Sequence, residues 1–238
     1  MSSLPLLSLL VFLPWLGAAL IAALGRAPAS THRRIALAAS LSTLAVALAL
    51  LPGFDPARTS PQFVERHAWI GALNVHYHLG LDGLSLILVL LTGLVAPAAL
   101  CAAFRAGGAV RGFAAFFLLL QGAALGVFTA LDFFHWFIFW ELSLFPAYFL
   151  IKLWGGPGAT RAAYQFVIYT IGGSAFMLLA FASLFGVAGT FDFQQLAQLG
   201  VDGTLARKLG GEGSFWAQAV FLGVLLGLAV KVPLWPFH

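Results

Sequence analysis

The chain has 238 residues, of which 61% are hydrophobic and only 8% are charged, and its formal net charge is +4. A soluble domain carries roughly 25% charged residues, so this sequence lacks the polar residues for a hydrated surface and is typical of an integral membrane protein. The basic residues lie between apolar segments, which argues against nucleic acid as a partner. The single cysteine, Cys101, lies in an apolar run, which excludes a disulfide framework and a cysteine-ligated metal or redox site.

Seven apolar stretches are long enough to cross about 30 Å of hydrocarbon as α-helices. The predicted spans are 4–24, 34–52, 79–104, 112–131, 133–153, 162–188 and 216–238. Helix is the expected form because an isolated strand would leave backbone groups unpaired in lipid, and the alternation of a membrane barrel is absent. The first stretch lacks the charged residues that precede the apolar run of a signal peptide, and Arg26 follows it instead. We therefore interpret it as a retained membrane helix and not as a cleaved signal peptide. The sequence therefore predicts an all-α, polytopic membrane helix bundle.

Charged residues divide unevenly between the two sets of alternate loops. One set has no acid and carries the basic residues Arg26, Arg33, Arg34, Arg105, Arg111, Lys152 and Arg161. The opposite set mixes acids and bases and contains the long segments 53–78 and 189–215. Because basic loops stay on the cytoplasmic side, we predict that the N-terminus lies outside and the loop at 105–111 inside. The run GTFDFQQLAQL from residue 189 is expected to form a short amphipathic helix along the interface.

Two ionisable residues lie deep inside predicted spans, Glu141 in the fifth and Lys231 in the seventh. A charge at mid-bilayer costs roughly 2.5–3.5 kcal/mol on insertion scales, so we expect the two side chains to face the interior and pair. One interpretation is a structural ion pair that joins two helices. We favour a proton-transfer pair, because burial disfavours both charges while their attraction favours them, and a change in separation would change their protonation.

Three prolines follow the two buried charges closely: Pro146, Pro233 and Pro236. Each removes one helical hydrogen bond and frees the carbonyl four residues earlier, which predicts a break in the fifth span and a broken seventh helix. Broken helices beside a buried charge are typical of transporters. A proline kink that serves packing alone is the alternative.

Other polar residues in the spans carry weaker signals. Gln165 and Tyr169 are four residues apart and share one face of the sixth span, where they either line a proton path or hydrogen-bond a neighbouring helix. His238 is a further candidate for the proton path. Gly172 and Gly173 are expected to let another helix approach closely.

Four residues near the start of the fifth span are expected at the membrane boundary. Asp132 and His135 should lie near the outer interface, and Trp136 and Trp140 should face lipid. The chain contains no GxGxxG motif after a strand and no acidic metal cage, so no cofactor or metal site is predicted in it.

Five runs carry specific motifs. They are GLDGLSLILVLLT (80–92), FWELSLFPAYFLIKLWGG (139–156), YTIGGSAFMLLA (169–180), GTFDF (189–193) and AVKVPLWPFH (229–238). In this order they resemble subunit M, the antiporter-like, subunit-4 type chain of proton-translocating NADH:quinone oxidoreductase, respiratory complex I. The resemblance covers residues 80–238, and the first two spans fit it in kind only.

The resemblance implies part of a roughly fourteen-helix antiporter-like fold. Residues 1–78 would form two N-terminal helices and an outer loop. Residues 79–238 would carry the third to seventh helices, with the first antiporter-like repeat starting near 112. Because this family has further channel charges on later helices, the chain looks truncated at 238.

In this family the fifth-helix glutamate and the seventh-helix lysine are the paired charges of a proton channel, and they correspond to Glu141 and Lys231. The resemblance implies a non-redox, proton-pumping translocase subunit in the bacterial cytoplasmic (inner) membrane. Flavin and iron–sulfur clusters are expected in partner subunits, through which NADH and quinone would act. Other membrane-arm subunits, lipid and protons are the expected direct partners. Alternatives are a subunit of a multi-subunit cation/proton antiporter or of a related membrane-bound hydrogenase, and a passive structural element of a membrane complex.

Overall fold

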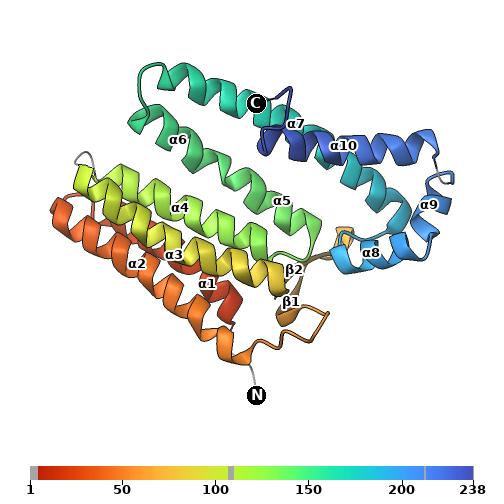
Figure 1. The fold of residues 1–238 in the computed structure, drawn as a ribbon, viewed down its shortest axis with the longest axis horizontal. Coiled ribbons are helices and arrows are strands. Elements are labelled where there is room, and N and C mark those ends of the chain that lie inside the picture. The colour runs from red at the N-terminus through yellow and green to blue at the C-terminus, as the bar shows by residue number, and fades with distance from the viewer. Residues whose placement is uncertain (1–4, 107–109, 212, 238) are drawn as a thin grey trace.

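The computed structural model describes residues 5–106, 110–211 and 213–237. In this part of the chain, six helical segments are long and apolar enough to cross a membrane (Figure 1). They are α1 (Leu6–Ala23), α2 (Ala29–Ala49), α3 (Gly83–Ala106), α4 (Val110–Thr129), the consecutive α5 (Phe133–Leu142) and α6 (Leu144–Trp154), and α7 (Ala159–Ala188). A seventh apolar helix, α10 (Phe215–Lys231), has 17 residues and rises about 25 Å. The predicted polytopic helix bundle is confirmed.

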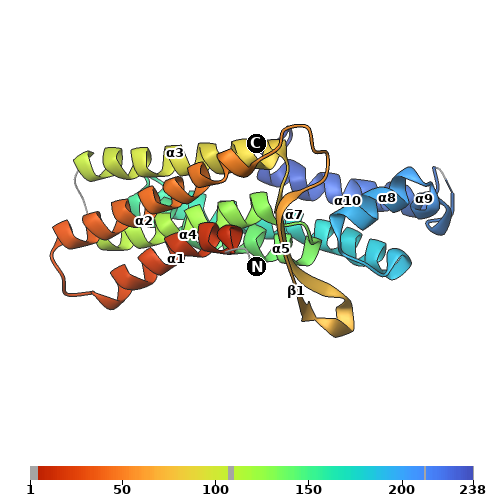
Figure 2. The same cartoon turned by 90° about the horizontal axis from the view of Figure 1, so that it is seen from below.

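The helices pack as two groups with α5 and α6 between them (Figures 1 and 2). In the first group, α1 packs on α2 and α4, and α2 packs on α3. In the second group, α10 packs along α7. The α6 helix contacts both α4 and α7, so the interrupted pair α5–α6 connects the two groups.

Close helix contacts in the first group depend on glycine. A Cβ on Gly17 of α1 would lie 2.5 Å from the Ala39 side chain of α2. A Cβ on Gly126 of α4 would lie 2.2 Å from the Phe139 ring of α5. Lipid is as apolar as the side chains, so close van der Waals packing between small residues stabilises such helix pairs.

Segment 53–78 is not a plain loop as predicted, because most of it forms an antiparallel β-hairpin. Strand β1 (Gln62–Ile70) pairs with β2 (Val75–Leu81), with His67 opposite Tyr77. Short 3-10 turns at Leu51–Gly53 and Gly71–Leu73 flank β1, and the second ends at Asn74 in a left-handed conformation with φ 49°. Because β2 continues to Leu81, the third span begins at Gly83 rather than at 79.

The hairpin lies at the same end of the molecule as α8 (Phe193–Val201) and α9 (Thr204–Lys208) (Figures 1 and 2). The predicted amphipathic run from residue 189 thus contains the helix α8. The loop between α1 and α2 and the loop between α6 and α7 lie at the opposite end (Figure 1). The two sets of loops expected from charge are therefore separated in space.

The last apolar helix is shorter than predicted. The α10 helix ends at Lys231, directly before Val232 and Pro233, whereas the sequence predicted a span to 238. The Ala229 carbonyl is not left free, because it accepts a hydrogen bond of 2.8 Å from the Leu234 amide. This compact end fixes Lys231 at the helix C-terminus, where a positive charge interacts favourably with the helix dipole.

Candidate functional site: a lysine at an interrupted helix

Lys231 is positioned by the close packing of α10 against α7. A Cβ on Gly227 would lie 3.1 Å from the Gly173 carbonyl oxygen, and one on Gly173 would lie 2.8 Å from Val230. Gly173 therefore permits the approach predicted for it, whereas a Cβ on Gly172 would meet nothing within 4 Å. The two glycines in contact bring the end of α10 towards α5 and α6.

The Lys231 ammonium group binds the chain where α5 ends. Its Nζ donates a hydrogen bond of 2.6 Å to the Trp140 carbonyl and one of 3.0 Å to Ser143 Oγ. The same nitrogen lies 3.9 Å from the centre of the Trp140 ring, a distance that allows a cation–π interaction. The lysine thus contacts two oxygens and one aromatic face.

These acceptors are available because the helix is interrupted at Ser143. Pro146 has no backbone N–H to donate to the Leu142 carbonyl, and the chain divides into α5 and α6 three residues before it. Ser143 Oγ also donates a 2.7 Å hydrogen bond to the Trp140 carbonyl. The interruption therefore places the Trp140 carbonyl and Ser143 Oγ within hydrogen-bond distance of Lys231 Nζ.

The sequence predicted that Trp140 faces lipid, but in the structure it is buried. Only 9% of its surface is exposed, and its indole Nε1 donates to Ser174 Oγ of α7 at 3.3 Å. Trp136 stacks on it with ring centroids 4.6 Å apart and is itself only partly exposed. Both tryptophans pack against other helices, because α7 covers this face of α5 and Lys231 at the end of α10 contacts Trp140.

The direct ion pair expected between Glu141 and Lys231 is not formed in this structure. Among the described residues, no salt bridge within 4.0 Å involves Glu141, and its Oε1 is buried without a hydrogen-bond partner. Lys231 instead holds the carbonyl of Trp140, the residue directly before Glu141. Lys231 therefore binds the backbone next to Glu141 without forming an ion pair with the Glu141 carboxylate.

The other candidates for a proton path lie away from these contacts. Gln165 and Tyr169 share one face of α7 as predicted, and both are exposed. In the described part of the chain, neither makes a side-chain hydrogen bond. Tyr169 lines a surface cavity of about 280 Å³ together with Phe237. His238 lies outside the described residues.

A second group of polar side chains, which the sequence did not reveal, is buried at the hairpin end. We call it the hairpin-end cluster, and it comprises Arg66, His78, Asp132, His135 and Asp192. All but Arg66 are at most 4% exposed, so Asp132 and His135, which were expected near the outer interface, lie at the start of α5 but are shielded from solvent. His78 Nδ1 lies 3.1 Å from Asp192 Oδ2, and Arg66 lies 3.8 Å from the same oxygen. These side chains come together because the hairpin folds against the starts of α5 and α8. Such a contact between distant segments could not be predicted from the local sequence.

The two aspartates of the cluster cap two helices. Asp132 Oδ1 accepts the Phe134 and His135 amides at the start of α5, and Asp192 Oδ1 accepts the Gln194 and Gln195 amides at the start of α8. Both sequences read Asp-Phe at the cap, which is the signal that could have identified them.

The aspartates differ in their charge environment. Burial raises the pKa of the Asp132 carboxyl above its ordinary value, although three backbone amides oppose that shift. Burial acts in the same direction on Asp192, but contact with His78 and two backbone amides outweigh it and lower the pKa of Asp192. The two carboxyl groups of the cluster therefore have pKa values shifted in opposite directions. In the described residues, no group of three or more His, Cys, Asp or Glu side chains has metal-binding geometry.

The chain combines spanning helices, an interrupted span and a partly buried lysine that binds the interruption beside a glutamate. This combination defines a polytopic membrane protein of the ion-translocating kind. Comparison with known proteins makes the class specific. A family model described as "NADH:quinone oxidoreductase/Mrp antiporter, TM" matches residues 130–238.

Individual relatives agree with this match. NADH-quinone oxidoreductase subunit M of Rhodobacter capsulatus is 37% identical over 98% of this chain and 46% of its own length. F(420)H(2) dehydrogenase subunit M of Methanosarcina mazei is 36% identical over 84% of this chain and 40% of its own. A chain in the structure of respiratory complex I from Thermus thermophilus with bound NADH is 30% identical, with a TM-score of 0.80 over 98% of this chain and 45% of that chain.

The predicted resemblance of this chain to the antiporter-like subunit M of NADH:quinone oxidoreductase is confirmed. The chain spans about half the length of the relatives named here.

Proposed function

We propose that this chain is part of a proton-translocating subunit of NADH:quinone oxidoreductase, with Glu141 and Lys231 as its proton-transfer residues. The proposal includes a location in the bacterial cytoplasmic membrane, with the hairpin end and the N-terminus outside. Flavin and iron–sulfur chemistry would belong to partner subunits. The names of the relatives support the coupling to a redox complex, and the arginine-rich loops support the orientation.

The observation that carries the proposal is the position of Lys231 on the Trp140 carbonyl, one residue from Glu141. Two acceptors of different charge are thus adjacent along the chain, a neutral carbonyl and a carboxylate. At about 4 Å and an effective dielectric of about 20, the attraction between two unit charges is roughly 4 kcal/mol. A hydrogen bond from a charged donor to a neutral carbonyl contributes about 1.5–3 kcal/mol net. Moving the Lys231 ammonium from the carboxylate to the carbonyl therefore stabilises its protonated form less, so that Lys231 releases its proton more readily.

The proposed cycle uses this difference. In one state Lys231 lies on Glu141 and retains its proton. A change in the field along the membrane draws the two apart, Lys231 moves to the Trp140 carbonyl and Ser143, and its proton passes to a downstream acceptor. The free amine takes up a proton from the inner side and returns to Glu141. The buried, unpartnered Oε1 of Glu141 supports a short return step, since pairing would satisfy that atom.

Replacing Glu141 tests this role in the full-length subunit within its complex. Glu141→Gln should leave the complex assembled but reduce proton pumping at least tenfold, because the amide cannot supply the alternating charge. Glu141→Asp should retain part of the activity, because the charge remains on a shorter side chain. Asp202→Asn, which alters an exposed acid outside the spans, is the matched control and should pump normally. Normal pumping in the Glu141→Gln complex would return this residue to a structural role.

The alternative is a subunit of a cation/proton antiporter without a redox partner, because the matching family model includes Mrp antiporters. The relatives with 36% and 37% identity are named as dehydrogenase or oxidoreductase subunits, which favours the redox-linked function. Purification of the native complex distinguishes the two, since only the redox-linked form should contain hydrophilic subunits with flavin and iron–sulfur clusters.

A further inference from the structure

A groove of about 600 Å³ runs between α1 and α4 on the face of the bundle. We call it the α1–α4 groove, and it is lined by Trp15, Ala18, Ala19, Ile21, Ala22, Arg111, Gly112, Ala115, Phe116 and Leu119. All lining residues but Arg111 are apolar or amphipathic. The groove extends about 10 Å along α1, from Trp15 to Ala22.

Trp15 closes the groove near the middle of α1. Its indole Nε1 donates a 3.0 Å hydrogen bond to the Leu119 carbonyl of α4. A Cβ on Gly122 would lie 2.4 Å from the same ring, so the indole packs directly on the α4 backbone. The polar atom of Trp15 is satisfied, and this end of the groove presents hydrocarbon to its contents.

Arg111 lies at the other end of the groove, and some of its guanidinium N–H donors are not used in hydrogen bonds. Its guanidinium donates to the Ala22 carbonyl at 3.2 Å and to the Gly25 carbonyl at 3.3 Å. A guanidinium has five N–H donors in a fixed plane, and no other acceptor for Arg111 occurs among the described residues. The side chain is exposed, so the remaining donors are available to an external anion.

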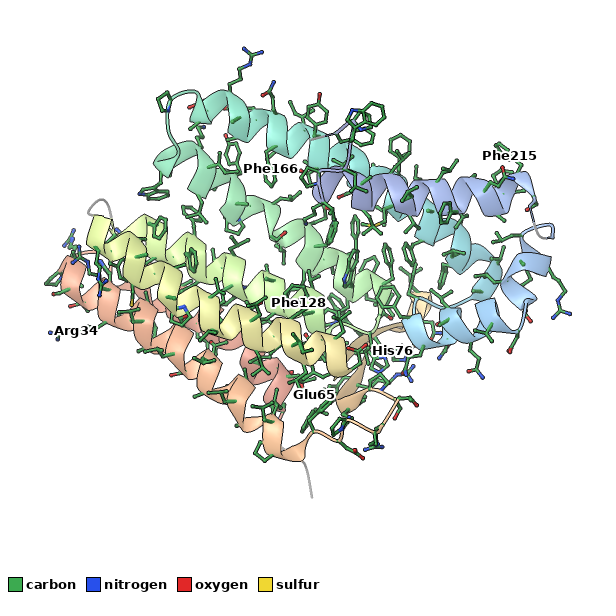
Figure 3. All side chains as sticks on the ribbon, in the orientation of Figure 1. Arg34, Glu65, His76, Phe128, Phe166 and Phe215 are labelled. Carbon is green, nitrogen blue, oxygen red and sulfur yellow. The ribbon has the colours of Figure 1, made fainter. Side chains whose placement is uncertain are left out.

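The surroundings of Arg111 carry positive charge only. Arg26 follows Gly25 directly, Arg34 is exposed near the start of α2 and is labelled at this end in Figure 3, and Arg105 is exposed in the last turn of α3. The sequence places no Asp or Glu in the loops at this end. An apolar groove with a cationic, acid-free rim is complementary to a molecule with a hydrocarbon tail and an anionic head.

We propose that the α1–α4 groove binds an anionic phospholipid, with one acyl chain between Arg111 and Trp15 and the phosphate on the Arg111 guanidinium. Basic pockets between membrane helices recognise anionic headgroups in this way. Small side chains at Ala19, Ala22 and Ala115 leave room for the chain, and Arg111 offers a planar donor set that suits phosphate oxygens. The proposal rests on the membrane location and does not depend on the proposed proton-transfer role.

Photolabelling of the full-length subunit in its complex tests the proposal. The complex is placed in phosphatidylcholine nanodiscs with a trace of phosphatidylglycerol that carries a photoreactive acyl chain, and cross-linked peptides are mapped. We expect labelling of 18–22 and 112–119. One arginine near an anionic headgroup contributes about 1 kcal/mol, so Arg111→Gln should reduce labelling about fivefold. Arg58→Gln, which makes the same charge change at an exposed position in the segment before the hairpin, should not reduce it.

A second pair of variants separates shape from charge. Ala19→Leu fills the groove and should reduce labelling, whereas Ala23→Leu, on an exposed position of the same helix outside the lining, should not. Equal labelling by a phosphatidylcholine probe would show ordinary boundary lipid and overturn the proposal. Displacement by inorganic phosphate alone, or absence of labelling because another polypeptide covers the groove, would also overturn it. Since labelling needs no proton pumping, loss of the proposed function would leave these results unchanged.

Discussion

Asp192 joins three elements through its two carboxylate oxygens. Oδ1 accepts two amides at the start of α8, and Oδ2 faces His78 of β2 and Arg66 of β1. The Asp192 side chain is only 6% exposed, so its charge is compensated mainly by protein groups. Removing one partner from such a site leaves the others unsatisfied, which costs more than the interaction itself contributes.

We predict that Asp192→Asn lowers the free energy of unfolding of the full-length subunit by about 1.5–3 kcal/mol, because asparagine retains the helix cap but loses the charged contacts. Because the folded state lowers the pKa of Asp192, its contribution is present above the unfolded value near 3.9 and is lost as the pH falls below it. Thermal unfolding in detergent between pH 7 and pH 3 should show a smaller acid-induced loss in the variant. Equal acid sensitivity in both proteins would show that Asp192 is not the responsible group.

At this scale, the sequence predicts the residues whose chemistry conflicts with their surroundings. Glu141 and Lys231 are identifiable because each is a charge within an apolar run. The acceptor of Lys231 was not predictable, because a backbone carbonyl is present at every residue and only the interruption at Ser143 makes that of Trp140 available.

Among the elements, the hairpin determines how α1 begins. Glu65 of β1 accepts the Leu7 amide at 2.7 Å and the Ser8 amide at 3.1 Å, and it also accepts the Ser8 hydroxyl. A strand residue thus caps a helix 58 positions away in the sequence. Figure 3 labels Glu65 and His76 in this region, where the hairpin meets the helix bundle. The hairpin therefore fastens the first helix group to the cluster that holds α5 and α8.

The spans were predictable from length and hydropathy, because lipid leaves helix as the only form for an isolated apolar segment.

The β-hairpin was not predicted, although the sequence contains a signal for it. QFVERHAWI and VHYHLGL are rich in β-branched and aromatic residues and are separated by GALN, which favours a turn. The end of α10 was misplaced because apolar residues continue beyond the prolines, and hydropathy alone does not register the missing N–H groups.

For the whole molecule, the separation of basic and mixed loops predicts its orientation in the membrane. Cysteines introduced at the exposed positions Arg105 and Arg161, after replacing the native Cys101 with serine, should react with a membrane-impermeant maleimide only from the inside. A cysteine at the exposed Asp202 should react only from the outside. Labelling of all three from one side would contradict the arrangement of spans.

In the proposed function, Lys231 carries a proton and does not merely join two helices. A structural pair is damaged mainly by leaving one charge alone, at a cost of about 3–5 kcal/mol, so removing both charges should restore function. A proton carrier gives the opposite result, because an assembled protein without the amine still cannot transfer protons. Lys231→Arg should also fail, since the guanidinium keeps its proton at any physiological pH.

The most direct test is proton uptake in vesicles that contain the reconstituted complex, measured beside electron transfer from NADH. We predict that the double variant Glu141→Gln with Lys231→Met assembles normally and retains electron transfer at a reduced rate, with proton uptake at least tenfold lower. Proton uptake restored in this double variant, or intact in Lys231→Arg, would show that Lys231 is not the proton carrier and has only a structural role.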